Sequence, residues 1–430
     1  MKINSLFAIL LLAGITTASA GDKSEAVTLP NGMTAILHSF PHTNVTCVAL
    51  FARAGSICET DSTAGITRFM EKSLFRMTGS RRDVRAELDS YGGDFQSGVN
   101  QDFAVFAVTA SGAFLFPILD LFNDVVRDAR FNDSLAADVR LELTRRLEEE
   151  RKNPDVQILS RYLSLAFREH PYRFMPHGSA EGFRVLTAAD VRRHFEMAFV
   201  PRNLVLVVTG QFERAGLIDR LKNGIGRFER ESRAFSAWRP ESRHAAAVDV
   251  RERHGFGPNV AFVTVGWPAP AVSDPATVAM DVLVTALGNG QSSRLNRQIR
   301  VSAPSLYSVW SEYRTPRDPG FIRITAACPP ADADSVRSAI LREVRILQDD
   351  LMPEPEMARA KRMLAATESF SREGATDYAN YIGYWATMAD LDLARQYVRR
   401  IRAVRQEDVR NTVRTFMTDE QRVSIILMPE

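Results

Sequence analysis

Histidine and cysteine, which build most metal and nucleophilic sites, are scarce in this chain. Its 430 residues include 7 histidines and 3 cysteines. Three cysteines do not make a disulfide framework, so we expect them to be buried as small apolar side chains. One bridge between Cys47 and Cys58, which we place on adjoining strands, stays open as an alternative.

Several functional signatures are also missing. The formal net charge is +2 and no dense basic run occurs, which argues against a nucleic-acid partner. There is no G-x-S-x-G elbow, and no cysteine has a plausible histidine partner. The Gly288-Asn289-Gly290 turn lacks the G-K-[ST] of a phosphate-binding loop, so we expect a tight turn before a helix.

Long apolar runs are confined to the N-terminus. Residues 1–20 contain Lys2, an apolar run from Leu6 to Ile15, and the small-residue site Ala18-Ser19-Ala20. This is the pattern of a secretory signal peptide. No later run is long enough to span a bilayer. We therefore expect export to a bacterial periplasm, without stable membrane insertion.

The chain exceeds the length of one typical core, and its two halves end alike. Residues 185–192 match residues 403–410, and the apolar run 204–208 matches 422–426 at the same offset of 218 residues. A helix and a strand repeated at one offset indicate an internal duplication. The polar, Arg-rich segment 224–246 has no periodicity and is predicted to be a linker. The expected domains are residues 21–223 and 247–430, in an α+β fold.

Local patterns place several elements of the first half. The runs 26–29 and 33–38 flank a Pro-Asn-Gly turn and predict a hairpin, and the apolar runs 45–52, 102–110 and 203–209 predict strands. Helical periodicity covers 116–126, 136–151 and 186–198, the last with Thr187 as its cap.

A helix that begins at Gly65 carries the most informative pattern. Arg68, Glu71 and Lys72 stand at i, i+3 and i+4, where an H-x-x-E-H zinc helix has two histidines around its general base. Arginine and lysine have no lone pair for a metal at neutral pH, and a base without metal-bound water has little to activate. The simplest alternative is a salt-bridged helix face.

The residues around this helix resemble the insulinase/pitrilysin family of zinc peptidases. The shared features are Ala64-Gly65, Phe69-Met70-Glu71, Leu74-Phe75-Arg76 and Thr78. The family's third ligand is a glutamate on a later helix. Counting from Tyr91-Gly92-Gly93 or from Asn153-Pro154-Asp155 places it at Arg146. The resemblance implies two homologous insulinase-like domains, each a mainly antiparallel sheet packed with helices, that form half of a clamshell around a peptide.

A second match lies in the C-terminal half. In the context Ser292-Ser293-Arg294-Leu295, the helix to Arg300 is followed by a strand that begins near Tyr307. Insulinase-like enzymes carry an Arg and a Tyr at this spacing, which reach the zinc site of the opposing half. A guanidinium and a phenol can stabilise the oxyanion of peptide hydrolysis. Alternatively, Arg300 caps its helix and Tyr307 packs in the strand.

The resemblance implies a non-catalytic subunit that holds no metal of its own. We expect Arg300 and Tyr307 to act in trans on a catalytic insulinase-like partner with an intact H-x-x-E-H, in a heterodimer that binds peptide substrates. One alternative is a stand-alone structural or peptide-binding protein. Another is an active peptidase with substitute ligands.

The remaining candidates are weaker. The histidines are scattered, and Pro41 opposes one helical face for His38 and His42. His170 and His177 fall in a loop that also resembles the family, and the resemblance implies a structural role for it. Residues 95–105 match the family's edge strand, which is a covered edge or one that binds peptide by strand addition.

Overall fold

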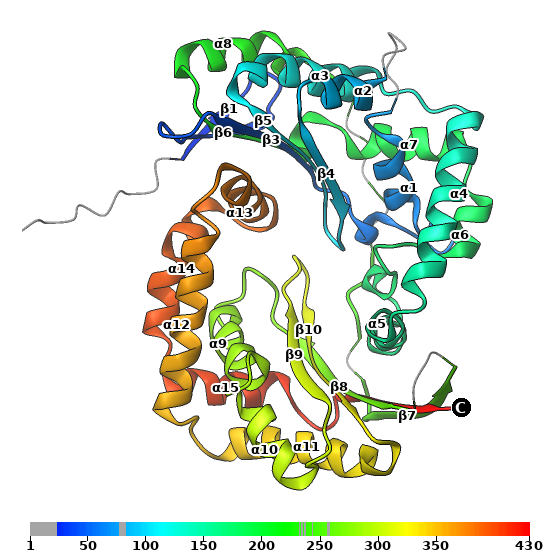
Figure 1. Ribbon diagram of the computed structural model, residues 1–430, viewed down its shortest axis with the longest axis vertical. Helices are drawn as coiled ribbons and strands as arrows, with labels where there is room; N and C mark the ends of the chain where they lie inside the picture. Colours follow the sequence, from blue (N-terminus) through cyan, green and yellow to red (C-terminus); the bar gives the residue numbers. More distant parts are fainter. Residues whose placement is uncertain are drawn as a thin grey trace, which may run out of the picture.

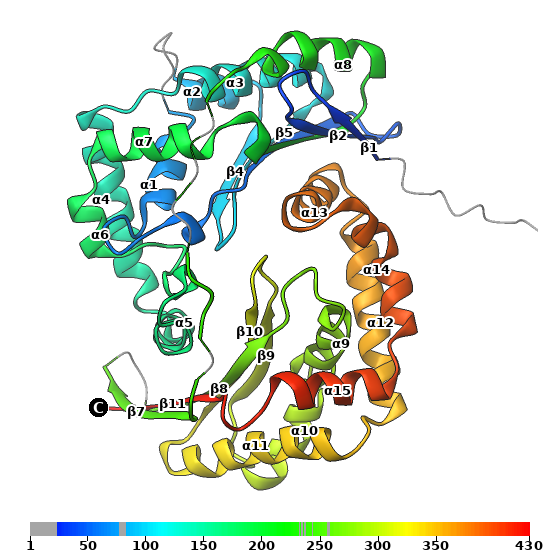
Figure 2. The ribbon, with the colours of Figure 1, turned by 180° about the vertical axis from the view of Figure 1, so that it is seen from behind.

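The computed structural model describes residues 24–76, 83–231, 233, 235, 238–242, 244–255 and 259–430, with the backbone alone at 302. The expected signal peptide, residues 1–20, lies outside this range. Figures 1 and 2 show two halves, each a sheet covered by helices, facing one another. No helix in the described part of the chain is both long and apolar enough to cross a membrane.

The N-terminal half is built on a six-stranded sheet of order β1-β2-β6-β3-β5-β4. Its strands are β1 Glu25–Thr28, β2 Thr34–Ser39, β3 Val45–Ala52, β4 Asp94–Val99, β5 Ala104–Ser111 and β6 Leu204–Gly210. Its helices are α1 Ile66–Ser73, α2 Val84–Ser90, α3 Leu115–Asp128, α4 Asp133–Glu150, α5 Pro154–Ala166, α6 Ala180–Val185, α7 Ala188–Ala198 and α8 Arg214–Asn223. The predicted hairpin, strands and helices of this half are confirmed.

The C-terminal half is built on a five-stranded sheet of order β7-β11-β8-β10-β9. Its strands are β7 Val248–His254, β8 Ala261–Ala269, β9 Ser308–Arg314, β10 Gly320–Cys328 and β11 Val423–Pro429. Its helices are α9 Thr277–Gly288, α10 Arg294–Ser302, α11 Ala333–Asp349, α12 Glu354–Phe370, α13 Ala375–Met388, α14 Leu391–Ala403 and α15 Gln406–Phe416.

The two halves share one topology, as the predicted duplication requires. In each sheet a parallel pair (β2 with β6, β7 with β11) is followed by three antiparallel neighbours in the same order. Helix α7 shifted by 218 residues coincides with α15. Each of these helices begins with an aspartate three residues after its cap, and that aspartate accepts the cap's backbone N–H (Asp190 from Thr187, 3.0 Å; Asp408 from Arg405, 2.8 Å).

Both faces of the N-terminal sheet are buried, which explains its unbroken apolar strands. Val48, Leu50 and their neighbours face the core beneath α1, α3 and α7. Cys47, Ala49 and Phe51 alternate with them and face α13, a helix of the other half. Cys47 and Cys58 are both free, so the bridge left open above is wrong. Cys47 is directed into this interface, where burial raises the pKa of its thiol to about 11.

The halves exchange equivalent helices. Helix α5 of the N-terminal half packs on β8 and β11, whereas α13, its counterpart at the repeat offset, packs on β3 and β6. A glycine allows close approach at each contact. A Cβ on Gly383 of α13 would lie 2.1 Å from the Phe51 ring, and one on Gly266 of β8 would lie 2.5 Å from Tyr162 of α5. Each sheet thus depends on the opposite half for cover.

Polar contacts fix the ends of both exchanged helices. Arg53, next to β3, donates to the carbonyls of Ala386 (2.8 Å) and Thr387 (3.2 Å) in the last turn of α13, which otherwise lack intrahelical partners. Arg323, buried in β10, donates to Asp155 in the first turn of α5 at 2.9 Å. The halves therefore form one cooperative unit.

Substitution of Gly383 by alanine should lower the free energy of unfolding by about 1–3 kcal/mol, because the methyl group overlaps the Phe51 ring. This effect should exceed the roughly 1 kcal/mol that alanine gains over glycine in a helix. Urea denaturation provides the measurement. Gly216→Ala in α8 is the control, since its Cβ would meet only the end of the flexible Glu213 side chain. Equal stability of the two variants would show that the contact does not constrain the interface.

Candidate functional site

The helix α1 is held in place at its first turn. Its cap, Gly65, has φ 90°, and an added Cβ would lie 2.7 Å from the Phe183 ring. The buried carboxylate of Glu59 accepts the backbone N–H groups of Gly65 (2.7 Å) and Thr67 (3.1 Å). Burial raises the pKa of Glu59 to about 7. These contacts fix which face of α1 is directed at β4 and α4.

Glu71 lies at the centre of a closed polar network on that face. Its side chain is fully buried and accepts from Arg68 Nη1 and Lys72 Nζ, each at 3.0 Å. Ser97 of β4 donates to the same carboxylate. Three donors engage one carboxylate, so Glu71 is a structural anchor between α1 and β4.

Arg146 belongs to a second network that adjoins the first. On α4, Glu142 pairs with Arg146 at 3.1 Å through one oxygen and with Arg76 through the other. Burial lowers the pKa of Lys72, and the charges of Arg68 and Arg146 lower it further against the attraction of Glu71. The four residues predicted from the zinc motif are thus brought together at the junction of α1, α4 and β4.

Arg300 and Tyr307 lie elsewhere. Arg300, in the last turn of α10, donates from Nη1 to the carbonyl of Leu306 at 2.6 Å, which places its guanidinium beside Tyr307. Tyr307 precedes β9, and its side chain is 56% exposed. Its hydroxyl has no hydrogen-bond partner among the described residues. Helices α10 and α1 lie in opposite halves of the molecule (Figure 1), so this pair does not reach the chain's own Glu71 network.

The strand β4 forms the outer edge of the N-terminal sheet. It pairs with β5 from Asp94 to Val99, and no other described strand lies along its second side. Ser97 stands midway along this strand and donates to Glu71, so the Glu71 network lies against the edge strand β4.

Comparison with known proteins identifies the fold and its lineage. Residues 34–174 match the insulinase family, peptidase family M16, and residues 186–364 match the peptidase M16 inactive domain. The chain belongs to the insulinase family. It is 27% identical to an uncharacterized zinc protease of Mycobacterium bovis over 74% of each chain. It is 22% identical to the zinc protease PqqE of Helicobacter pylori over 100% of this chain and 98% of that protein. A solved protease structure from Helicobacter pylori superposes with a TM-score of 0.87 at 21% identity, covering 95% and 100% of the two chains.

The residues at the family's metal position do not fit zinc. Arg68, Lys72 and Arg146 are cations that cannot donate a lone pair. In the described part of the chain, no three histidine, cysteine, aspartate or glutamate side chains gather around one point. The nearby acids are engaged, since Glu142 holds two arginines and Glu150 lies 3.6 Å from His177. This insulinase-family chain is therefore a degenerate, peptidase-like member.

The buried histidines serve the domain junction or the core. His170 contacts Asp318 at 3.1 Å, and Asp318 also accepts from Trp238 Nε1 at 2.6 Å. The nearby Tyr172 donates to Asp102 at 2.8 Å. This network joins the N-terminal half, residue 238 of the expected linker and the β9–β10 turn. The sequence holds no signal for it, because its members are far apart along the chain.

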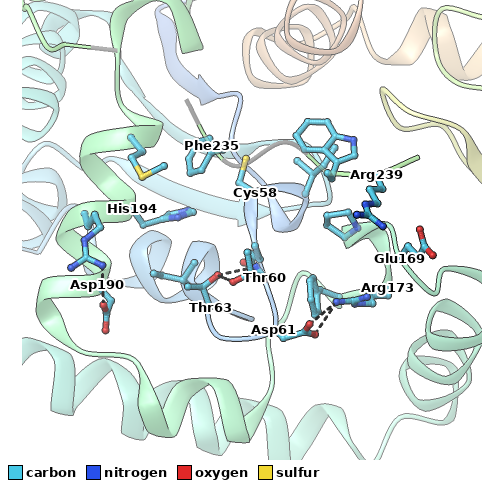
Figure 3. Close-up of a pocket in the computed structure, with 18 residues that line it drawn as sticks. Cys58, Thr60, Asp61, Thr63, Glu169, Arg173, Asp190, His194, Phe235 and Arg239 are labelled. Carbon is cyan, nitrogen blue, oxygen red and sulfur yellow. Dashed lines mark hydrogen bonds and ion pairs between the residues drawn. The ribbon is translucent and has the colours of Figure 1, made fainter. Parts of the chain in front are cut away.

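A cavity of about 580 Å³ lies behind α1, between the segment 57–63, α7 and the linker residues Phe235 and Trp238 (Figure 3). Its charged residues include the pair Asp61–Arg173 at 2.8 Å. Burial raises the pKa of its Cys58 thiol to about 12, which makes the thiol a poor nucleophile. Burial lowers the pKa of His194 to about 4, and its Nε2 lies 3.1 Å from Thr67 Oγ1. Nothing in this cavity suggests catalysis.

Restoring the ligands should restore the metal. The combination Arg68→His, Lys72→His and Arg146→Glu supplies the donor set of an inverzincin helix pair, and we expect about one zinc per chain by elemental analysis. The control is the double histidine variant with Arg145→Glu in place of Arg146→Glu. Residue 145 points to another side of α4, so zinc binding by this variant would contradict the assignment of the third ligand to position 146. Stoichiometric zinc in the unaltered chain would contradict the ligand argument.

Neutralising Glu71 should destabilise the fold. Glu71→Gln leaves Arg68 and Lys72 largely buried without their counter-charge. We expect the free energy of unfolding, measured by urea denaturation, to fall by roughly 2–3 kcal/mol. Glu142→Gln is the control, because the Glu142 side chain is 29% exposed. Its substitution should lower the free energy of unfolding by about 1 kcal/mol or less. A free, catalytic Glu71 would instead leave stability unchanged.

Proposed function

We propose that this chain is the non-catalytic subunit of a periplasmic, two-chain insulinase-like metallopeptidase. A homologous partner with an intact H-x-x-E-H would hold the zinc, and this chain would bind peptide and present Arg300 and Tyr307. One observation carries the proposal. The position that the resemblance assigns to the metal is filled by cations, whereas Tyr307 is exposed and the half-buried Arg300 retains unused N–H donors.

The chemistry of the exposed pair supports a role in trans. After its bond to Leu306, the Arg300 guanidinium still has further N–H donors, and no described residue accepts from the Tyr307 O–H. Both groups suit an oxygen on which negative charge develops during peptide hydrolysis. The Leu306 contact also holds the guanidinium at a fixed position, which lowers the entropy lost on binding.

The surface around the pair supports contact with another chain. Val301, next to Arg300, is 79% exposed, and Tyr307 is 56% exposed. These are two of the most exposed large apolar side chains among the described residues. Their burial by a partner would remove apolar area from water beside the proposed catalytic pair.

Tyr307→Phe should lower turnover by the mixed complex about 10²- to 10³-fold, the usual effect of removing one oxyanion donor. Complex size, followed by gel filtration, should be unchanged because only the hydroxyl is lost. Arg300→Ala should also reduce turnover. Arg297→Ala, one turn earlier on α10 and paired with Glu356, is the matched control. Unchanged turnover with Tyr307→Phe and Arg300→Ala would refute the role in trans.

A second function, a peptide-binding protein without catalysis, is favoured by the free edge of β4. An extended peptide can add to such an edge through main-chain hydrogen bonds. Peptide binding by the chain alone, with no complex and no gain in hydrolysis on mixing with its nearest zinc-bearing homologue, would favour this function over the first.

A further inference from the structure

The position that lacks zinc carries a surplus of positive charge. Among the described residues, Arg68, Lys72, Arg76 and Arg146 share two carboxylates, Glu71 and Glu142. Two positive charges are therefore uncompensated within the two networks. The side chains of Arg68 and Lys72 are each only 15% exposed, so water screens this surplus poorly.

One member of the networks and one neighbour respond to the surplus. The pKa of Lys72 is lowered by burial and also by Arg68 and Arg146. The pKa of His177 is lowered by burial, and although Glu150 opposes this, the charges of Arg68 and of Arg314 lower it further. Arg314 lies at the end of β9, in the C-terminal half, where it is paired with Glu312 of the same strand.

The surplus lies where a bound peptide would pass. Ser97 joins the Glu71 network from the middle of β4. A peptide strand added to the free edge would lie about 4.8 Å from β4. Beside the networks, a groove of about 350 Å³ runs along α4, where Arg145 and Arg146 alternate with Asp138, Glu142 and Glu149 around the half-exposed Leu141. The charge for an anion therefore comes from the cations of the two networks, and the groove adds an apolar wall, Leu141, for a neighbouring side chain.

We propose that this degenerate metal position is an anion site that binds a carboxylate of a peptide lying along β4, held by Arg68, Lys72 and Arg146. This inference rests on the proposed peptide binding. A carboxylate supplies the missing negative charge and accepts two N–H donors of a guanidinium in one plane. The site that positions the scissile bond in an active enzyme then holds a peptide end or an acidic side chain.

Fluorescence anisotropy of the full chain tests the proposal with labelled peptides of about ten residues and mixed sequence. One set ends in a free acid and one in an amide. A third set is amidated and carries a central glutamate, and its match carries glutamine. We expect about tenfold tighter binding of a carboxylate set than of its neutral match. The preference should shrink as salt rises from 50 to 500 mM, because screening weakens the attraction.

The pattern among the sets identifies the source of the carboxylate. Preference for the free acid assigns a chain terminus, and preference for glutamate assigns a side chain. Lys72→Gln and Arg146→Gln should abolish the preference while binding of the amide is kept. Arg146 is half exposed, so its variant should fold. Arg193→Gln, an exposed site on α7, is the charge-matched control. Equal binding of charged and neutral sets would overturn the anion site alone, and no binding of any set would overturn peptide binding itself.

Discussion

The exchange of α5 and α13 between the halves is the constraint on which the rest of this structure depends. Each helix covers a sheet face that its own half leaves bare, and each contact requires a glycine opposite an aromatic ring. The inner face of β3 and β6 is therefore as apolar as the outer face. The Glu71 network, the free edge of β4 and the Arg300–Tyr307 pair are positioned on this shared frame.

Helix α1 has the position of a zinc-binding helix, but ion pairs stand where a metal ion would be bound. In an active member of this architecture, a metal ion would connect α1 to α4. Here, a hydrogen bond from Ser97 to Glu71 joins β4 to α1, the ion pairs of Glu71 lie within α1, and a second set of ion pairs on α4 adjoins them. Since partly buried cations need counter-charge, Glu71 serves stability whatever its ancestral role was. Retention of this glutamate alone is thus poor evidence for catalysis.

Much of the fold could be predicted because its signals are local. The run 45–52 is apolar and β-branched, and β3 has these bounds. Thr187 and Asp190 form a capping box that starts α7. The helix predicted from residue 186 begins two residues later because Leu186 closes α6. The motif around Gly65 could be read for the same reason, since its residues lie on one helix face.

Contacts between distant residues could not be predicted. Nothing near Phe51 in the sequence shows that it meets Gly383, and no local pattern links Ser97 to Glu71 or His170 to Asp318. Spacing from two turns pointed to Arg146, which lies on α4 next to α1, but only the structure shows that its partner is Glu142. Such pairs arise from packing between elements, for which hydrophobic periodicity carries no information.

The helix exchange also bears on how a chain of this kind can be divided or can arise. A half-length chain would expose the apolar face formed by Ile36, Ala49 and Phe51, because the helix that covers it is encoded in the other half. Two copies of such a half could cover one another by trading their equivalent helices, as domain-swapped dimers do. The duplicated chain has the geometry of that swapped pair, joined end to end. At the repeat boundary, the chain therefore connects two halves that pack like the subunits of a domain-swapped dimer. Cutting the chain there would not give two separable units.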